Sequence, residues 1–204
     1  MKYFFANTFF IVFLLFPIVN ENQEAEWELK KEEDGIRVYT REVEGSNIRE
    51  FKASSHISAS QETIYNILLD IPNYPKWIED VEEASILSKA ENERDFHYQL
   101  SLPWPMKDRD IAMSMKIYYQ DDQSILLKLT SNSLLVPEND DFIRMYNVVG
   151  EWLVTPMDDS NCQVTYQFLA DPEGFLPAWV INIFIIDGPF KTLKNLQEYS
   201  LIKK

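Results

Sequence analysis

The chain has 204 residues, a length that fits one domain because chains usually divide only above roughly 250 residues. Its 33 acidic against 19 basic residues give a net charge of -14, which repels nucleic acid and disfavours electrostatic docking on anionic bilayers. The high aromatic content (13 Phe, 10 Tyr and 5 Trp) and only five Gly predict a packed interior and not a disordered chain.

The first residues have the pattern of an export signal. Lys2 precedes an apolar run that ends at Val19, and a polar stretch follows directly. Because the Ala-x-Ala cleavage pattern is missing, residues 1–22 are predicted to be either a cleaved signal peptide or an uncleaved N-terminal anchor. We therefore expect residues 23–204 to form a monomeric domain that lies in the periplasm or is secreted.

The N-terminal third of this domain combines strands with one helix. Short strands are predicted within residues 27–43 around the turn Asp34-Gly35, and another over residues 51–57. Ser58 and Gln61 then have the spacing of a capping box before apolar residues at helical spacing. Pro72 is predicted to stop that helix.

The middle of the chain shows almost only strand patterns, separated by short polar connections. Sequential strands joined by tight loops predict an antiparallel meander, which excludes the parallel sheet of a dinucleotide-binding fold. The sole cysteine, Cys162, cannot form an internal disulfide and is predicted to be a small strand residue. The predicted strands cover residues 85–88, 96–102, 109–119, 125–131, 143–155 and 163–170.

A long helix is predicted over residues 177–200, broken or kinked near Pro189. Its apolar side chains recur at helical spacing, and burial of each large one is worth ~1.5–3 kcal/mol. The sheet is the only partner large enough to cover them. Gly188 and Pro189 are predicted either to form a hinge or to be a static kink.

The strand over residues 109–119 places Arg109 on the same face as aliphatic and thioether side chains, because strand side chains alternate between faces. A buried guanidinium must meet a carboxylate, bound water or the polar end of a ligand. A structural ion pair and a ligand contact remain alternatives. Glu151 and Gln99 are the candidate partners. The face of Glu151 is open, whereas Gln99 lies opposite the apolar face of Phe96, Tyr98 and Leu100 unless a bulge shifts the register.

The pattern offers no catalytic set. His56 and His97 are the only imidazoles, and both are predicted to face solvent. The chain has no metal-ligand spacing and no glycine-rich phosphate loop, so no metal or cofactor is predicted. The apolar tip Leu134-Leu135-Val136 is predicted either to touch a bilayer transiently or to fold over the edge of the core.

Three short stretches, in their order and spacing, resemble the START domains, the lipid-transfer branch of the helix-grip superfamily. They are Tyr-Pro-Lys-Trp-Ile at residues 74–78, Pro-Met-Lys-Asp-Arg-Asp-Ile at 105–111 and Gly-Phe-Leu-Pro at 174–177. The resemblance covers residues 25–200. It implies an α+β helix-grip fold, in which a curved antiparallel β-sheet wraps around a long C-terminal α-helix and leaves one cavity.

The resemblance also implies that Arg109 faces this cavity, and that an acidic residue of the preceding strand meets it in some relatives. The corresponding position here is neutral Gln99, which favours a ligand with an anionic or hydrogen-bonding head. We expect non-enzymatic binding, and transfer, of a lipid or other amphipathic hydrophobic ligand. The alternatives are an enzyme of the polyketide cyclase and aromatase branch, or a ligand-free envelope interaction protein. The predicted ligand-binding residues are Arg109, Ile111, Met113, Met115, Ile117, Trp179, Ile183, Phe184, Phe190, Gln99 and Glu151.

Overall fold

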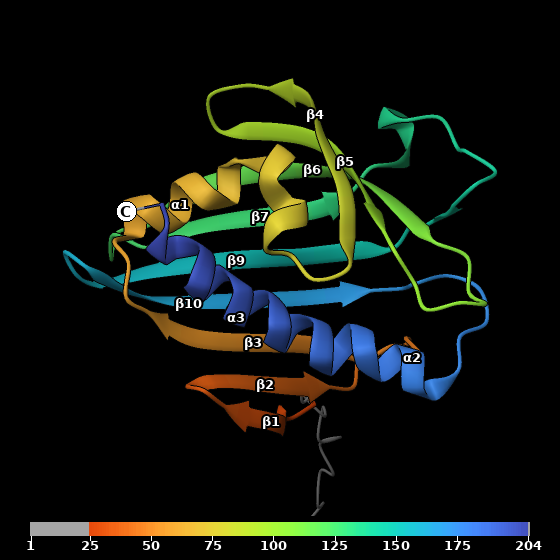
Figure 1. The fold of residues 1–204 in the computed structure, drawn as a ribbon, viewed down its shortest axis with the longest axis horizontal. Helices are drawn as coiled ribbons and strands as arrows, with labels where there is room; N and C mark the ends of the chain where they lie inside the picture. The colour runs from red at the N-terminus through yellow and green to blue at the C-terminus, as the bar shows by residue number, and fades with distance from the viewer. Residues whose placement is uncertain (1–24, 204) are drawn as a thin grey trace, which may run out of the picture.

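Ten strands form one curved sheet around the C-terminal helix in the computed structural model, which describes residues 25–203 (Figure 1). The strand order is β1-β2-β3-β10-β9-β7-β6-β5-β4, all antiparallel, while β8 pairs in parallel with β6. This confirms the predicted α+β helix-grip fold. The strands are β1 (Glu28–Glu33), β2 (Ile36–Arg41), β3 (Glu50–Ile57), β4 (Val81–Lys89), β5 (Glu93–Leu100), β6 (Arg109–Tyr119), β7 (Ile125–Ser131), β8 (Ile143–Arg144), β9 (Val148–Asp158) and β10 (Asn161–Ala170).

Local sequence explains the first hairpin. Asp34 and Gly35 have φ values of 52° and 74°, which suits the tight turn between β1 and β2 because Asp and Gly tolerate the left-handed region. On β2, Ile36, Val38 and Thr40 are buried at every second position. The hairpin predicted at this turn is confirmed.

The first helix, α1 (Gln61–Leu69), begins later than the predicted capping box places it. Its N-cap is Ser60, whose hydroxyl oxygen accepts a hydrogen bond from the Thr63 backbone N–H at 3.1 Å. The Ser58–Gln61 box is therefore wrong, since the buried Ala59 still belongs to the segment that enters the core. A 3₁₀ turn, η1 (Ile71–Lys76), follows the helix and contains Pro72.

The C-terminal helix continues past Pro189 without a break. It consists of α2 (Ala178–Asn182), a π-helical turn η3 (Ile183–Asp187) and α3 (Gly188–Leu201). In the π turn the Gly188 N–H donates to the Ile183 carbonyl five residues earlier, and the wider turn accommodates Pro189, which would clash in an ordinary helix. A Cβ on Gly188 would lie only 3.1 Å from that carbonyl oxygen. The predicted break is thus a π turn.

Residues 143–155, predicted as one strand, form two strands that pair differently. β7 pairs with β6 only from Met113 onward, so the start of β6 is free to pair with β8. The chain then turns at residues 145–147, and β9 pairs with β7 and β10. The single-strand prediction is wrong because two different neighbours compete for this segment.

The core fills the space between the concave face of the sheet and the helices. Within residues 25–203, no helix is both long and apolar enough to cross a membrane. Cys162 is buried on β10. The predicted signal or anchor at residues 1–22 lies outside the described part of the chain.

Candidate ligand cavity

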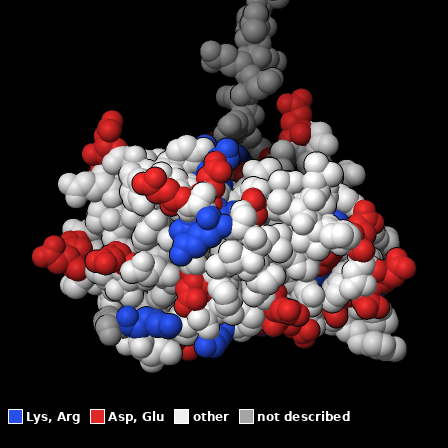
Figure 2. All heavy atoms as spheres, turned by 90° about the horizontal axis from the view of Figure 1, so that it is seen from above, with Lys and Arg blue, Asp and Glu red and all other residues white. Residues whose placement is uncertain are grey.

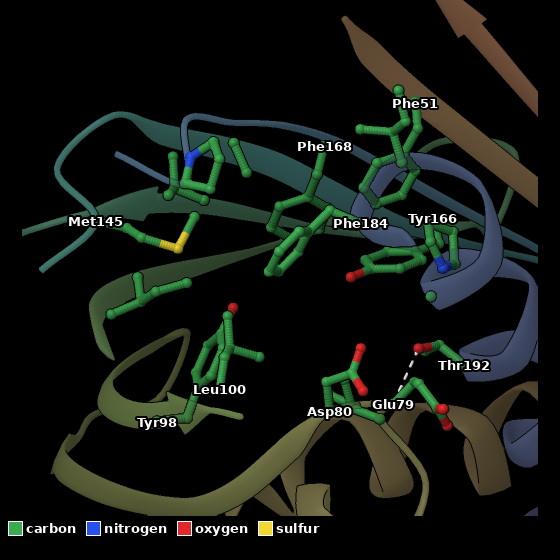
Figure 3. A pocket seen from close by; sticks show the side chains of 18 of the residues that line it. Phe51, Glu79, Asp80, Tyr98, Leu100, Met145, Tyr166, Phe168, Phe184 and Thr192 are labelled. Atoms are coloured by element: carbon green, nitrogen blue, oxygen red, sulfur yellow. Dashed lines mark hydrogen bonds between the residues drawn. The ribbon is translucent and has the colours of Figure 1, made fainter. Parts of the chain in front are cut away.

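A cavity of about 80 Å³ lies between the concave face of the sheet and the first half of the C-terminal helix (Figure 3). This volume is small beside the roughly 300–1,000 Å³ of typical small-molecule sites. Strands β3, β5, β6 and β10, the turn before β4 and the helix all contribute to the wall. The lining side chains include Phe51, Asp80, Tyr98, Leu100, Ile111, Met145, Tyr166, Phe168, Phe184, Ile185 and Thr192.

Close packing fixes the aromatic wall of the cavity. Phe168 on β10 lies directly over Gly150 on β9, where an added Cβ would come within 2.3 Å of the ring. Tyr166 stacks on Trp152 with ring centroids 3.9 Å apart and an interplanar angle of 12°. Phe51 meets Tyr166 edge to face at 5.0 Å. These contacts leave the rings few alternative orientations.

Three polar groups point into the cavity, namely the Asp80 carboxylate and the hydroxyls of Tyr98 and Tyr166 (Figure 3). Burial raises the pKa of both phenols. Burial also raises the pKa of Asp80, with a further increase from Glu79 and a partial offset by Lys191. The cavity is therefore amphipathic: these three groups, together with the lining residues Arg49, Glu79 and Thr192, interrupt a mostly apolar wall.

Within residues 25–203, Arg109 makes no ion pair with a carboxylate, and it does not line the cavity. Its Nε and Nη2 each donate at 2.9 Å to the carbonyl oxygens of Pro172 and Glu173, and Nη1 donates to the Lys107 carbonyl. The side chain is fully buried, and burial lowers the pKa of the guanidinium. Of the two alternatives left open for Arg109, a structural ion pair and a ligand contact, the structure shows neither: backbone carbonyls accept its hydrogen bonds, and neither Gln99 nor Glu151 is its partner.

The buried ion pair lies instead on the convex face, between Asp110 and Arg144. Arg144 donates in bidentate fashion to both Asp110 oxygens, at 3.0 and 2.7 Å, and to the Val136 carbonyl at 2.9 Å. His97 Nε2 lies 2.9 Å from Asp110 Oδ2, so its predicted solvent position is wrong. Burial alone would raise the pKa of Asp110, but hydrogen bonds from Arg144 and His97 hold it below its usual value.

The predicted ligand-binding residues fall into three groups. Ile111 and Phe184 line the cavity, which places them where a ligand would bind. Gln99 and Glu151 do not line the cavity. Gln99 lies opposite Asp110 in the register of β5 and β6, and Glu151 points outward because its neighbours Gly150 and Trp152 face inward. The others are Met113, Met115, Ile117 and Phe190, which are buried in the core, Ile183, which is half-buried, and Trp179, which is 52% exposed.

The sequence reasoning missed the polar residues of the cavity. Tyr98 belongs to the apolar strand face that the alternation predicts, which was the available signal. Tyr166 also lies on a correctly predicted strand. Nothing in the local pattern distinguishes Asp80, whose position depends on its backbone φ of 63°. In the described part of the chain, no three His, Cys, Asp or Glu side chains gather as a metal site requires.

A curved antiparallel sheet that wraps around a C-terminal helix defines the helix-grip class of proteins. The START domain family matches residues 19–199, and the chain belongs to this family. It is 30% identical over 183 residues to the uncharacterized protein PA1579 of Pseudomonas aeruginosa. The matched residues make up 90% of this chain and 91% of the relative.

Two solved structures share the fold. The STAR-related lipid transfer protein fragment of Xanthomonas axonopodis is 30% identical, with a TM-score of 0.80 over 86% of this chain and 98% of that fragment. Human STARD10 is 24% identical, with a TM-score of 0.74 over 86% of this chain and 73% of that one. The second likeness concerns the fold alone.

Proposed function

We propose that this protein binds an amphipathic, lipid-like ligand in the cavity without changing it chemically, and transfers it between membranes outside the cytoplasm. The observation that supports this proposal is the cavity itself, because its aromatic and aliphatic wall is interrupted by Asp80, Tyr98 and Tyr166. Apolar burial supplies affinity at roughly 25 cal/mol per Å², and the polar groups orient the ligand. The lipid-transfer title of the Xanthomonas relative supports this function, and residues 1–22 support the location.

Ligand entry requires the cavity to widen. At about 80 Å³, it has room for only a small part of a long-chain ligand. Phe184 and Ile185 belong to the π turn and also line the cavity, so a shift of this turn would enlarge the space. Movement about Gly188 and Pro189 remains the predicted route for release.

Three nearly fully exposed apolar side chains mark the surface that we propose for membrane contact. Trp104, Leu134 and Phe175 are 90%, 94% and 93% exposed. They occupy three loops, residues 101–108, 132–142 and 171–177, which we call the three-loop end and which lie together at the right of Figure 1. Loop contacts connect them, because Arg109 donates to Pro172 and Lys107 donates to the Asp140 carbonyl.

The charge of the three-loop end favours an electrically neutral bilayer. Lys107 is its one basic residue by sequence, against six acidic ones. Figure 2 shows basic side chains only in small separate groups on the face that it draws, without a continuous basic stripe. Contact would therefore depend on insertion of apolar side chains and would respond little to salt. The acidic residues are Asp108, Glu138, Asp140, Asp141, Asp171 and Glu173.

Filling the cavity tests the binding proposal. Ala170 lines the cavity and is half-buried, so Ala170→Phe introduces a ring into the open space. Native mass spectrometry of protein purified from the exported fraction should show a lipid adduct on the wild type and not on the variant. Circular dichroism would establish that the variant is folded. A wild type without adduct, equal occupancy in both proteins, or a ligand released with altered covalent structure would contradict the proposal.

Flotation with phosphatidylcholine vesicles tests the membrane surface. Trp104→Ser with Phe175→Ser should lower the vesicle-bound fraction strongly, at both low and high salt. Leu87→Ser is a matched control, because Leu87 is an exposed apolar residue on the edge strand β4. Equal loss in the control, or binding that high salt abolishes, would contradict this part of the proposal.

A further inference from the structure

The charged groups that line the cavity differ in whether the protein neutralises them. Arg49 lies 3.2 Å from Glu28 and 3.1 Å from Glu42, and Glu79 pairs with Lys191 at 2.7 Å. The Asp80 carboxylate makes no hydrogen bond or ion pair to any residue in the range 25–203. Arg49 and Glu79 are each paired, whereas Lys191 influences Asp80 only without direct contact, so Asp80 is the charged lining residue that has no direct partner among residues 25–203.

We propose that the ligand has a positively charged nitrogen that binds the Asp80 carboxylate between the hydroxyls of Tyr98 and Tyr166. This inference rests on the proposed function and names the chemical class of its ligand, an amphipathic amine. An ammonium group would compensate the carboxylate and donate up to three hydrogen bonds. The surrounding aromatic rings also suit a cation.

The backbone holds Asp80 in a defined position. Its φ of 63° lies in the left-handed region, which Asp tolerates in turns. Its carbonyl oxygen accepts from the Ser101 N–H at 2.8 Å, which ties the turn before β4 to the end of β5. The carboxylate is thereby directed into the cavity, as Figure 3 shows.

The two phenols complete the acceptor set. In the described part of the chain, neither hydroxyl has a protein hydrogen-bond partner, although stacking on Trp152 fixes the Tyr166 ring. Both hydroxyls point toward the space that the Asp80 carboxylate faces. Unpaired polar groups that converge on a cavity are expected to find their partners in the ligand.

An anionic head group fits this site poorly. A carboxylate or phosphate beside Asp80 would meet like charge in a region of low dielectric. Arg109, the predicted partner for such a head, uses its donors on backbone carbonyls. Arg49 also lines the cavity, and its buried Nη2 has no hydrogen-bond partner within residues 25–203. Its guanidinium is, however, already held between the carboxylates of Glu28 and Glu42, and its Nε donates to the Thr40 hydroxyl at 3.0 Å. The electrostatics thus favour a cation over an anion.

Three ligands of equal chain length test the inference, namely dodecylamine, dodecanol and dodecanoate, measured by isothermal titration calorimetry. The wild type should bind the amine about tenfold more tightly than the alcohol, and the acid most weakly. Asp80→Asn keeps the shape and tolerates the same backbone, so it should remove the preference for the amine while it retains binding of the alcohol. Glu82→Gln, which removes an exposed carboxylate on β4 that does not line the cavity, should leave the preference unchanged.

The outcomes separate this inference from the proposed function. A preference for dodecanoate, or an amine preference that survives Asp80→Asn, would overturn the inference alone. If the wild type binds none of the three probes but carries a natural lipid adduct, the ligand class is wrong and the proposed function stands. If it carries no adduct either, both fail. Loss of amine preference in Glu82→Gln as well as Asp80→Asn would show a general charge effect and overturn the specific site.

Discussion

Arg109 and Asp110 are neighbours on β6, but their side chains lie on opposite faces of the sheet and satisfy their charges differently. On one side, Arg109 donates to carbonyls of residues 107, 172 and 173. On the other, Asp110 receives two hydrogen bonds from Arg144. The same dipeptide therefore uses backbone dipoles on one face and an ion pair on the other.

Arg109 and Arg144 hold two loops of the three-loop end in place. Arg109 fixes the loop that carries Phe175, and Arg144 fixes the loop that carries Leu134 through the carbonyls of Val136 and Pro137. Phe175 and Leu134 thus belong to loops that are anchored behind the exposed side chain. Arg109 and Asp110 therefore both act on loop structure, on opposite faces of the sheet.

The largest effect is expected from Arg144→Met. This change leaves Asp110 buried without its cation, and loss of one partner of a buried pair costs about 3–5 kcal/mol of unfolding free energy. Urea unfolding followed by tryptophan fluorescence would measure it. Asp110→Asn combined with Arg144→Met should recover part of the loss, since no charge is then left unpaired.

An exposed pair provides the control for that experiment. Arg37 lies 2.7 Å from Glu32 on the surface of the first hairpin, so Arg37→Met should have a much smaller effect. Similar losses in Arg144→Met and Arg37→Met would refute the distinction between the faces. The preference among the dodecyl probes should survive Arg144→Met, because the convex pair does not line the cavity.

The alternation along β6 predicts its faces because side-chain direction in a strand follows sequence parity. Ile111, Met113, Met115 and Ile117 are all buried, as that pattern requires. The partners of Arg109 could not be predicted in the same way. They are backbone carbonyls, two of them 63 and 64 residues away and one at Lys107, and every residue type carries a carbonyl.

The same limit applies to the cavity. The apolar face that includes Tyr98 is visible in the sequence, and the order of short motifs identifies the family. The direction of Asp80 depends on a left-handed backbone in a turn and on its contact with Ser101, which are tertiary features. The π turn likewise reflects the packing of Pro189 within a continuing helix, where the sequence alone indicates only an interruption.

The second-largest effect is expected from Gly150→Ala, on the concave face of the sheet. The added methyl group would overlap the Phe168 ring, which must move into the cavity or strain the strand. Overpacking of this kind costs about 1–3 kcal/mol, measurable in the same urea titration. Ligand occupancy in native mass spectrometry should fall as well, in contrast to Arg144→Met.

A smaller side chain at position 168 should relieve this overlap. Gly150→Ala combined with Phe168→Leu should regain part of the stability, because the branched side chain leaves room for the new Cβ. If Gly150→Ala is as stable as the wild type and equally occupied by ligand, Phe168 does not form a rigid part of the cavity wall.

The smallest effect is a pH dependence that Asp110 contributes. Its pKa in the folded protein lies below the unfolded value of about 3.9, so the stability from this group is present above that pH and is lost as the pH falls through the folded pKa. Protonation leaves the carboxyl group in place, still able to hydrogen-bond, so the loss should be smaller than in Arg144→Met.

The measurement is the unfolding free energy of wild type and Asp110→Asn between pH 6 and 3, at intervals of about half a unit. Because the other acidic groups titrate in both proteins, the informative quantity is the difference between the two curves. That difference should shrink as the pH falls, and parallel curves would mean that Asp110 is not stabilised as a carboxylate.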